Sequence, residues 1–310
     1  MPTSRCDLIW IYLATTAQSD RLLMLNDIKH ILAVVNQKDD GEIVLQKAEQ
    51  IAKATGASIR GLKVIYEDLR ISPGDDFEQN EALKSRLITT EETMLEQLLK
   101  PVLEATSLDV DSAVVWRKDE FRGIIDAAEE FAADLIVKST NHPVPEIIRT
   151  PQDWHLLRHS DVPVMLVKPV TWKSQPLVVA AVDIEDPEQE QLSKHIMDAA
   201  NQMCKTLDGK LYLVNSFPGI SQFTVQMRQT IGDEITNKVS RLAHDMGIEP
   251  DQIFAAEGKP HEALERLVDH QGAEILILGT SQRQGPSGFV FGNTSEAILH
   301  HVNSDVLVLK

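Results

Sequence analysis

An internal repeat constrains the fold more than any other feature of this sequence. "DLIVKSTNHP" followed by "DWHLLRHSDVPVMLVKP" in the first half corresponds to "EILILGTSQR" followed by "TSEAILHHVNSDVLVLK" in the second. The two copies are offset by roughly 140 residues, the size of an ordinary domain. The 310-residue chain is therefore predicted to contain one domain twice.

Each repeat alternates apolar strands with helices. In the second repeat, the predicted strands are "QPLVVAAVD", "GKLYLVNSF", "DQIFAAE", "AEILILG" and "SDVLVLK". The long helix before "DQIFAAE" has apolar residues every three or four positions, which predicts one buried face: Phe223, Met227, Ile231, Ile235, Val239, Leu242 and Met246. Near-continuous apolar strands between helices predict an α/β fold, with a parallel sheet covered on both faces and right-handed crossovers.

The expected organisation is a leader (1–23), a first domain (24–168), a linker (169–175) and a second domain (176–310). Arg5 followed by "CDLIWIYLATTAQS" weakly resembles a signal peptide and is too short to span a bilayer. The periodic pattern begins only after Met24. We therefore favour a disordered or spurious leader over an export signal.

Charge and cysteine content narrow the function. A formal net charge of -17 argues against nucleic-acid binding and against attraction to anionic membranes. The cysteines, Cys6 and Cys204, are too few and too far apart for a disulfide framework, which fits a cytoplasmic protein. Cys204 is expected to pack near the apolar stripe of its helix, formed by Leu192, Ile196, Met203 and Leu207.

Parallel sheets bind ligands beyond the carboxyl ends of their strands, where the strand order reverses. In the second repeat this rule selects Asp183 after the first strand, and Val214 and Asn215 near the end of the second. It also selects the glycine-containing loop that begins at Gly279 and Thr280.

Four segments, in the right order, carry a family resemblance: "VWRKDEF", "TPQDWHLLR", "EGKPHEAL" and "LGTSQRQGPSGFVFGNT". With the duplication, the chain resembles tandem members of the universal stress protein family, most closely their E type in Gram-negative bacteria. The resemblance implies two Rossmann-like (adenine nucleotide alpha hydrolase-like) domains, each with a five-stranded parallel sheet. It also implies a stress-response role and an internal pseudo-dimer, in which the last strands "VPVMLVK" and "SDVLVLK" meet.

Some members bind ATP through a glycine, two residues, a second glycine, nine residues, and then a glycine with serine or threonine. By position, Gly279 and Gly292 match the outer glycines, while Gln282 and Asn293 replace the second glycine and the hydroxyl residue. The resemblance therefore implies ATP, with magnesium, as a candidate cofactor of the second domain.

Three further residues complete this candidate site: Arg283 is the cation of the loop, Thr294 offers a hydroxyl one position late, and Asp183 matches the family's acidic residue facing the nucleoside. The alternative is a flexible connection, in which Asn293 and Glu296 begin a helix with a capping box.

The first repeat departs further from this pattern. Asn36 stands in place of the aspartate, and "KSTNHPVPEIIRTPQDW" contains no glycine. Lys138, Asn141 and the pair Thr150–Pro151 occupy the matching region, so we do not expect a triphosphate there.

Other chemistry has less support. The histidines at 155, 159, 300 and 301 are expected to have surface or packing roles rather than to bind a metal. No Walker lysine, nucleophile elbow or paired-carboxylate motif is present, so we expect no enzyme beyond a weak ATPase. A further hypothesis is a carrier of an apolar ligand between the repeats, lined by Trp116, Phe121, Trp154 and Leu157.

Overall fold

The computed structural model describes residues 28–36, 38–69, 77–140, 151–184, 189–217, 219, 224–280, 284–285, 288–289 and 302–309. The predicted leader lies outside these ranges, as does the predicted helix "TSEAILHHV" up to residue 301.

The first half forms five strands and four helices within the described ranges. The strands are β1 (His30–Val34), β2 (Ser58–Ile65), β3 (Val110–Trp116), β4 (Leu135–Ser139) and β5 (Val164–Val167). The helices are α2 (Lys38–Thr55), α3 (Phe77–Ala105), α4 (Glu120–Phe131) and α5 (Pro151–His159).

The second half repeats this order. Its strands in the main sheet are β6 (Leu177–Val182), β7 (Lys210–Phe217), β8 (Ile253–Glu257), β9 (Ile275–Gly279) and β12 (Asp305–Leu309). The helices are α6 (Glu190–Thr206), α7 (Val225–Ala243) and α8 (Pro260–Gln271), with the short 3-10 helices η3 (His244–Met246) and η4 (Pro250–Gln252). A two-residue antiparallel pair, β10 (Gln284–Gly285) with β11 (Gly288–Phe289), lies within the glycine loop.

All ten main strands belong to one sheet, in the order β3-β2-β1-β4-β5-β12-β9-β6-β7-β8. Every pairing within a half is parallel. The two halves join where β12 runs antiparallel to β5, with Val306 opposite Leu166. The parallel sheets and the meeting of the last strands, expected from the sequence and the resemblance, are thus confirmed.

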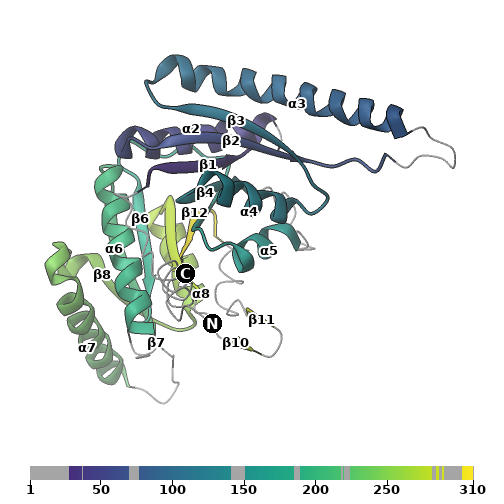
Figure 1. Cartoon of the computed structure of the whole chain (residues 1–310). Coiled ribbons are helices and arrows are strands. Elements are labelled where there is room, and N and C mark those ends of the chain that lie inside the picture. The colour runs from purple at the N-terminus through teal and green to yellow at the C-terminus, as the bar shows by residue number, and fades with distance from the viewer. Residues whose placement is uncertain are drawn as a thin grey trace, which may run out of the picture.

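Helices cover both faces of the sheet, and each face has its own apolar core. One core contains residues of α2, α3, α6 and α7, and the other contains residues of α4, α5 and α8. Helices α3 and α7 lie at opposite ends of the molecule, beside the outermost strands (Figure 1). The first turns of α3 extend beyond the sheet (Figure 1).

The packing of α6 follows the predicted stripe: Ile196 and Met203 are buried, and Leu192, Cys204 and Leu207 pack against the core. Burial raises the pKa of the Cys204 thiol above its ordinary value, so the thiol stays protonated at neutral pH.

The predicted apolar face of α7 is only partly confirmed. Ile235 and Val239 are buried, but Met227 is 47% exposed. The prediction for Met227 was wrong because it lies in the first turn, ahead of the residues through which α7 packs on the core. Phe223 lies outside the described residues.

A polar cluster holds the two halves together behind the β5–β12 seam. The Lys47 ammonium, on α2, lies 2.6 Å from the Asp305 carboxylate, at the start of β12, and both side chains are almost fully buried. Asp305 also accepts hydrogen bonds from the Trp172 indole N–H and from the Lys168 backbone N–H, each at 2.7 Å. Trp172 comes from the predicted linker, so this segment packs into the junction.

Candidate functional site

The carboxyl ends of β6, β7 and β9 meet at one edge of the sheet. Strand β6 lies between the other two, because the chain continues from β6 to β7 and β8 on one side and then returns to β9 and β12 on the other. This reversal of direction is the place where open parallel sheets bind ligands. The structure therefore brings Asp183, Asn215 and Gly279 to the same edge, as expected from the sequence.

Two side chains fix the backbone that follows β6. The Ser193 hydroxyl, on α6, accepts from the Asp183 N–H at 3.0 Å and donates to the Asp183 carbonyl at 2.8 Å. The Asn215 side-chain oxygen accepts from the Ile184 N–H at 3.1 Å, and the Asn215 amide donates to the Ser216 carbonyl. Asn215 is completely buried, whereas Asp183 is exposed. Asn215 thus positions the segment that presents Asp183 to solvent.

Val214 has a different environment. Its side chain is 3% exposed and lies in the core, and its backbone belongs to β7, between β6 and β8. A role for Val214 in ligand binding remains a prediction.

Gly279 has a packing reason to be glycine. A Cβ atom at this position would lie 2.7 Å from Leu192 Cγ and from Ile196 Cδ1, both on α6. Such distances are too short for carbon atoms, so α6 can approach β9 only because the side chain is absent. The close approach of a phosphate is thus not needed to explain this glycine.

Thr280 follows Gly279 and is tied to the last strand. Its backbone N–H and its hydroxyl both donate to the Leu309 carbonyl, at 2.8 and 3.2 Å. The start of the loop is therefore fixed by β12. The other predicted loop residues, Gln282, Arg283, Gly292, Asn293 and Thr294, lie outside the described residues.

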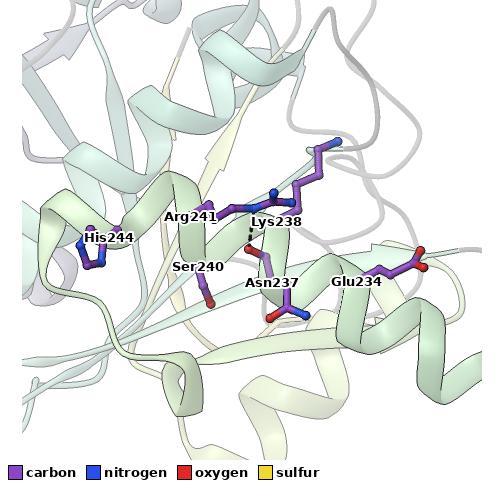
Figure 2. Close-up of a pocket in the computed structure, with 6 residues that line it drawn as sticks. All are labelled: Glu234, Asn237, Lys238, Ser240, Arg241 and His244. Atoms are coloured by element: carbon purple, nitrogen blue, oxygen red, sulfur yellow. Dashed lines mark hydrogen bonds between the residues drawn. The ribbon is translucent and has the colours of Figure 1, made fainter.

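The sequence reasoning missed a set of charged residues on α7. Lys238 donates a hydrogen bond to the Ile184 carbonyl, directly after Asp183. Lys238, Glu234, Asn237, Ser240, Arg241 and His244 line a pocket of about 950 Å³ (Figure 2). Figure 2 also shows the bond from Arg241 Nε to the Asn237 carbonyl, which orients the guanidinium along the helix. Lys238 places a cation beside the candidate site. The sequence did not indicate this role, because Lys238 lies on the polar face of an amphipathic helix, where a charged residue is ordinary.

In the first repeat, charged side chains occupy the corresponding edge of the sheet. Lys138 ends up almost fully buried in β4, where its ammonium lies 2.9 Å from an Asp153 carboxylate oxygen and 3.7 Å from a Glu120 carboxylate oxygen. A triphosphate would meet two carboxylates here and a lysine that they already neutralise. Asn36 follows β1 and is half-buried, Pro151 begins α5, and Asn141 and Thr150 lie outside the described residues.

The repeats nevertheless share local contacts. The carboxylate of Asp134, just before β4, accepts from the backbone N–H groups of Lys29 and His30 at the start of β1. Glu274, just before β9, accepts from the Leu177 N–H at the start of β6. The two halves are thus built alike and differ at their carboxyl edges.

The histidines have ring and backbone contacts. His155 stacks on Phe121 with ring centroids 4.9 Å apart, and His159 Nδ1 lies 2.7 Å from the His155 carbonyl oxygen. In the described part of the chain, no group of three metal-ligating side chains comes together. His300 and His301 lie outside it.

The expectation that four bulky residues line a cavity between the repeats is wrong. Trp116 ends β3, the outermost strand of the first half, where its ring centroid lies 6.0 Å from that of Tyr66. Leu157 is buried in a core, and Phe121 and Trp154 pack against that core. The seam between the repeats is formed instead by β5 and β12.

Of the helices in the described ranges, none combines the length and apolar character needed to cross a bilayer.

Comparisons with known proteins match both repeats to one family. The family model "Universal stress protein family" matches residues 27–168 and 177–310. The chain is 26% identical over 305 residues to Universal stress protein E of Escherichia coli (strain K12), covering 91% of this chain and 94% of that protein. It is 25% identical to the Universal stress protein E homolog of Haemophilus influenzae, covering 91% and 97%.

Solved structures agree with the fold. A universal stress protein from Pseudomonas aeruginosa superposes with a TM-score of 0.72 at 25% identity, covering 92% of this chain and 94% of that one. A universal stress protein from Archaeoglobus fulgidus superposes with a TM-score of 0.67 at 18% identity, covering 94% and 98%.

Proposed function

The chain belongs to the universal stress protein family, and on this basis we propose that it is a cytoplasmic stress-response binding and regulatory module whose second repeat binds a nucleotide. ATP with magnesium is the first candidate. We thus propose three things together: that the protein binds a nucleotide, that this nucleotide is ATP, and that the protein is cytoplasmic.

The proposal rests on a difference between the two repeats at the carboxyl ends of their strands. In the first repeat, Lys138 and two carboxylates occupy the edge. In the second repeat, the buried Leu278 stands at the position equivalent to Lys138, and Asp183, after β6, is exposed. An edge with an exposed acid suits a nucleoside, because a carboxylate can accept hydrogen bonds from ribose hydroxyls.

The phosphates would lie toward the glycine loop, where Arg283, Gly292, Asn293 and Thr294 remain the proposed contacts. Glycine residues allow backbone N–H groups to approach phosphate oxygens, and a helix beginning after such a loop adds the positive end of its dipole. Lys238 supports the same placement, because it puts a cation next to the residues that follow β6.

Regulation would follow from a difference in ligand affinity between two states of the protein. The segment Asp183–Ile184 connects a ligand at the sheet edge to α6 through Ser193 and to α7 through Lys238. A nucleotide that changes these contacts would alter the surface that the two helices present to a partner protein.

Titration calorimetry with ATP and magnesium tests this proposal. Asp183→Ala should weaken binding about tenfold, the effect of losing roughly 1.4 kcal/mol of binding free energy. Asn36→Ala, at the matching position of the first repeat, is the control and should leave the dissociation constant within about twofold. Equal affinities for both variants would refute the assigned site. ATP turnover should be no faster than in buffer, and sustained turnover would favour a weak ATPase instead.

A further inference from the structure

The first repeat contains a groove that is separate from the proposed nucleotide site, which lies in the second repeat. It is lined mainly by residues of α2 and α3, with Val35 after β1 and Lys63 on β2, and has a volume of about 780 Å³. Helices α2 and α3 lie in the upper part of Figure 1. This volume falls within the range of roughly 300–1,000 Å³ that small-molecule sites occupy. The inference drawn from it is independent of nucleotide binding.

The floor of the groove is apolar. It is formed by buried side chains from three elements: Val35 after β1, Leu45 on α2, and Leu95 and Val102 on α3. Met94, also on α3, lies at the opening and is 47% exposed. Covering this surface with the apolar part of a ligand would be favourable by about 25 cal/mol per Å².

The rim of the groove is acidic. Glu42 and Glu49 line it from α2, and Glu91 lines it from α3. Lys63, on β2, also lines the groove, and its ammonium lies 2.6 Å from the Glu91 carboxylate. Glu49 also pairs with the exposed Lys53 one turn along α2. Glu91 and Glu49 are thus each paired with a lysine, and Glu42 leaves the rim with a net negative charge, in a chain whose formal net charge is -17.

A proline interrupts the α3 wall of the groove. Pro101 lies inside α3 and has no N–H to donate to the carbonyl of Gln97, four residues earlier. Both residues line the groove. The carboxylates of the rim favour ligands that donate hydrogen bonds or carry positive charge.

From this combination we propose that the groove between α2 and α3 is a binding site for a cationic amphiphile, a small molecule with an apolar body and a positively charged or donor-rich end. The apolar body covers the floor formed by Val35, Leu45 and Leu95, and the charged end lies at the rim beside Glu42 and Glu49.

Calorimetric titration of the full chain with decyltrimethylammonium and with decyl sulfate tests the proposal, each below its critical micelle concentration. The two probes share an apolar chain and differ in the sign of the head group. We expect the cation to bind with a stoichiometry near one and at least tenfold more tightly than the anion. Circular dichroism recorded along the same titration should show an unchanged helix signal, and a loss of that signal in step with the heat would refute specific binding.

A pair of double variants locates the site. Glu42→Lys with Met94→Lys reverses the charge at the rim and should weaken binding of the cation at least tenfold. Glu96→Lys with Leu103→Lys makes the same change in charge at exposed positions of α3 outside the groove, and should change the affinity less than twofold. Equal binding of the two probes, no binding of the cation, or equal losses in the two double variants would each overturn the proposal.

Discussion

Substitution of Asp305 by asparagine should destabilise the whole molecule, because this residue lies in the junction of the two repeats. The carboxylate accepts from the Lys47 ammonium at 2.6 Å, the Trp172 indole at 2.7 Å and the Lys168 backbone at 2.7 Å. An asparagine side chain has one acceptor oxygen and would turn its NH₂ group toward one of these donors. The Lys47 charge would then remain buried without its counter-ion.

Breaking a buried ion pair in this way costs about 3–5 kcal/mol. With an m-value near 3 kcal/mol/M, the midpoint of urea unfolding should fall by roughly 1–1.7 M. Urea titration at pH 7, followed by circular dichroism, measures this shift. Glu190→Gln is the control, because the Glu190–Lys194 pair is nearly half exposed on both sides. Its loss should leave the midpoint of urea unfolding almost unchanged, because solvent screens an exposed pair.

A double-mutant cycle separates the pair from its surroundings. Lys47→Met should be destabilising by a similar amount, since it leaves the Asp305 carboxylate buried with two neutral donors. The double variant should lose clearly less than the sum of the two single losses, because neither charge is then left unpaired. Additive losses, or a loss below about 1 kcal/mol in Asp305→Asn, would refute the reasoning.

Three further predictions concern buried positions. Burial lowers the pKa of Lys47 in the folded protein. At pH values between that pKa and the ordinary value of a lysine, the unfolded chain therefore binds more protons than the folded protein, and the free energy of unfolding increases with pH. Urea titrations should show that the wild type gains stability relative to Lys47→Met as the pH rises through this window. Lys138→Met should cost about 3 kcal/mol in the same assay, because Asp153 and Glu120 lose their shared cation, and calorimetry should still detect no nucleotide in the first repeat. Gly279→Ala should cost about 1–3 kcal/mol in urea unfolding, because the new methyl group meets side chains of α6, and an unchanged midpoint would contradict the packing explanation.

Periodic features were predictable from the sequence. The repeat and the apolar strands gave the two-domain α/β fold, because a chain that alternates such strands with helices has few other ways to bury them. The pairing of the last strands came from the family resemblance and agrees with the structure. Asp183, Asn215 and Gly279 were brought to one edge by the general geometry of parallel sheets.

Long-range polar contacts were not predictable in the same way. Lys47 and Asp305 are separated by 258 residues, and neither position stands out in its own segment. Lys138 did carry a signal, since a lysine within the apolar run "LIVKS" needs a counter-charge once it is buried. Its partners, Glu120 and Asp153, came from helices whose packing the sequence did not specify.

The apparent roles of individual residues also changed. Gly279 was selected as part of a phosphate loop, and the structure supplies a packing reason for it instead. Asn215 was selected as a contact for the ligand, and its side chain holds the backbone at Ile184. A sequence pattern identifies positions such as these, where a small or polar residue interrupts an apolar segment. The pattern alone does not distinguish a residue that contacts a ligand from one that packs against, or holds, a neighbouring segment of the protein.

Hydrogen–deuterium exchange with and without ATP and magnesium tests the central claim most directly, because it locates the bound nucleotide in one repeat. We predict slower exchange in peptides that contain Asp183–Ile184 and Thr280, and unchanged exchange in the matching peptides around Asn36 and Thr140. Protection of both repeats, protection of the first alone, or no protection at saturating ATP would contradict the account.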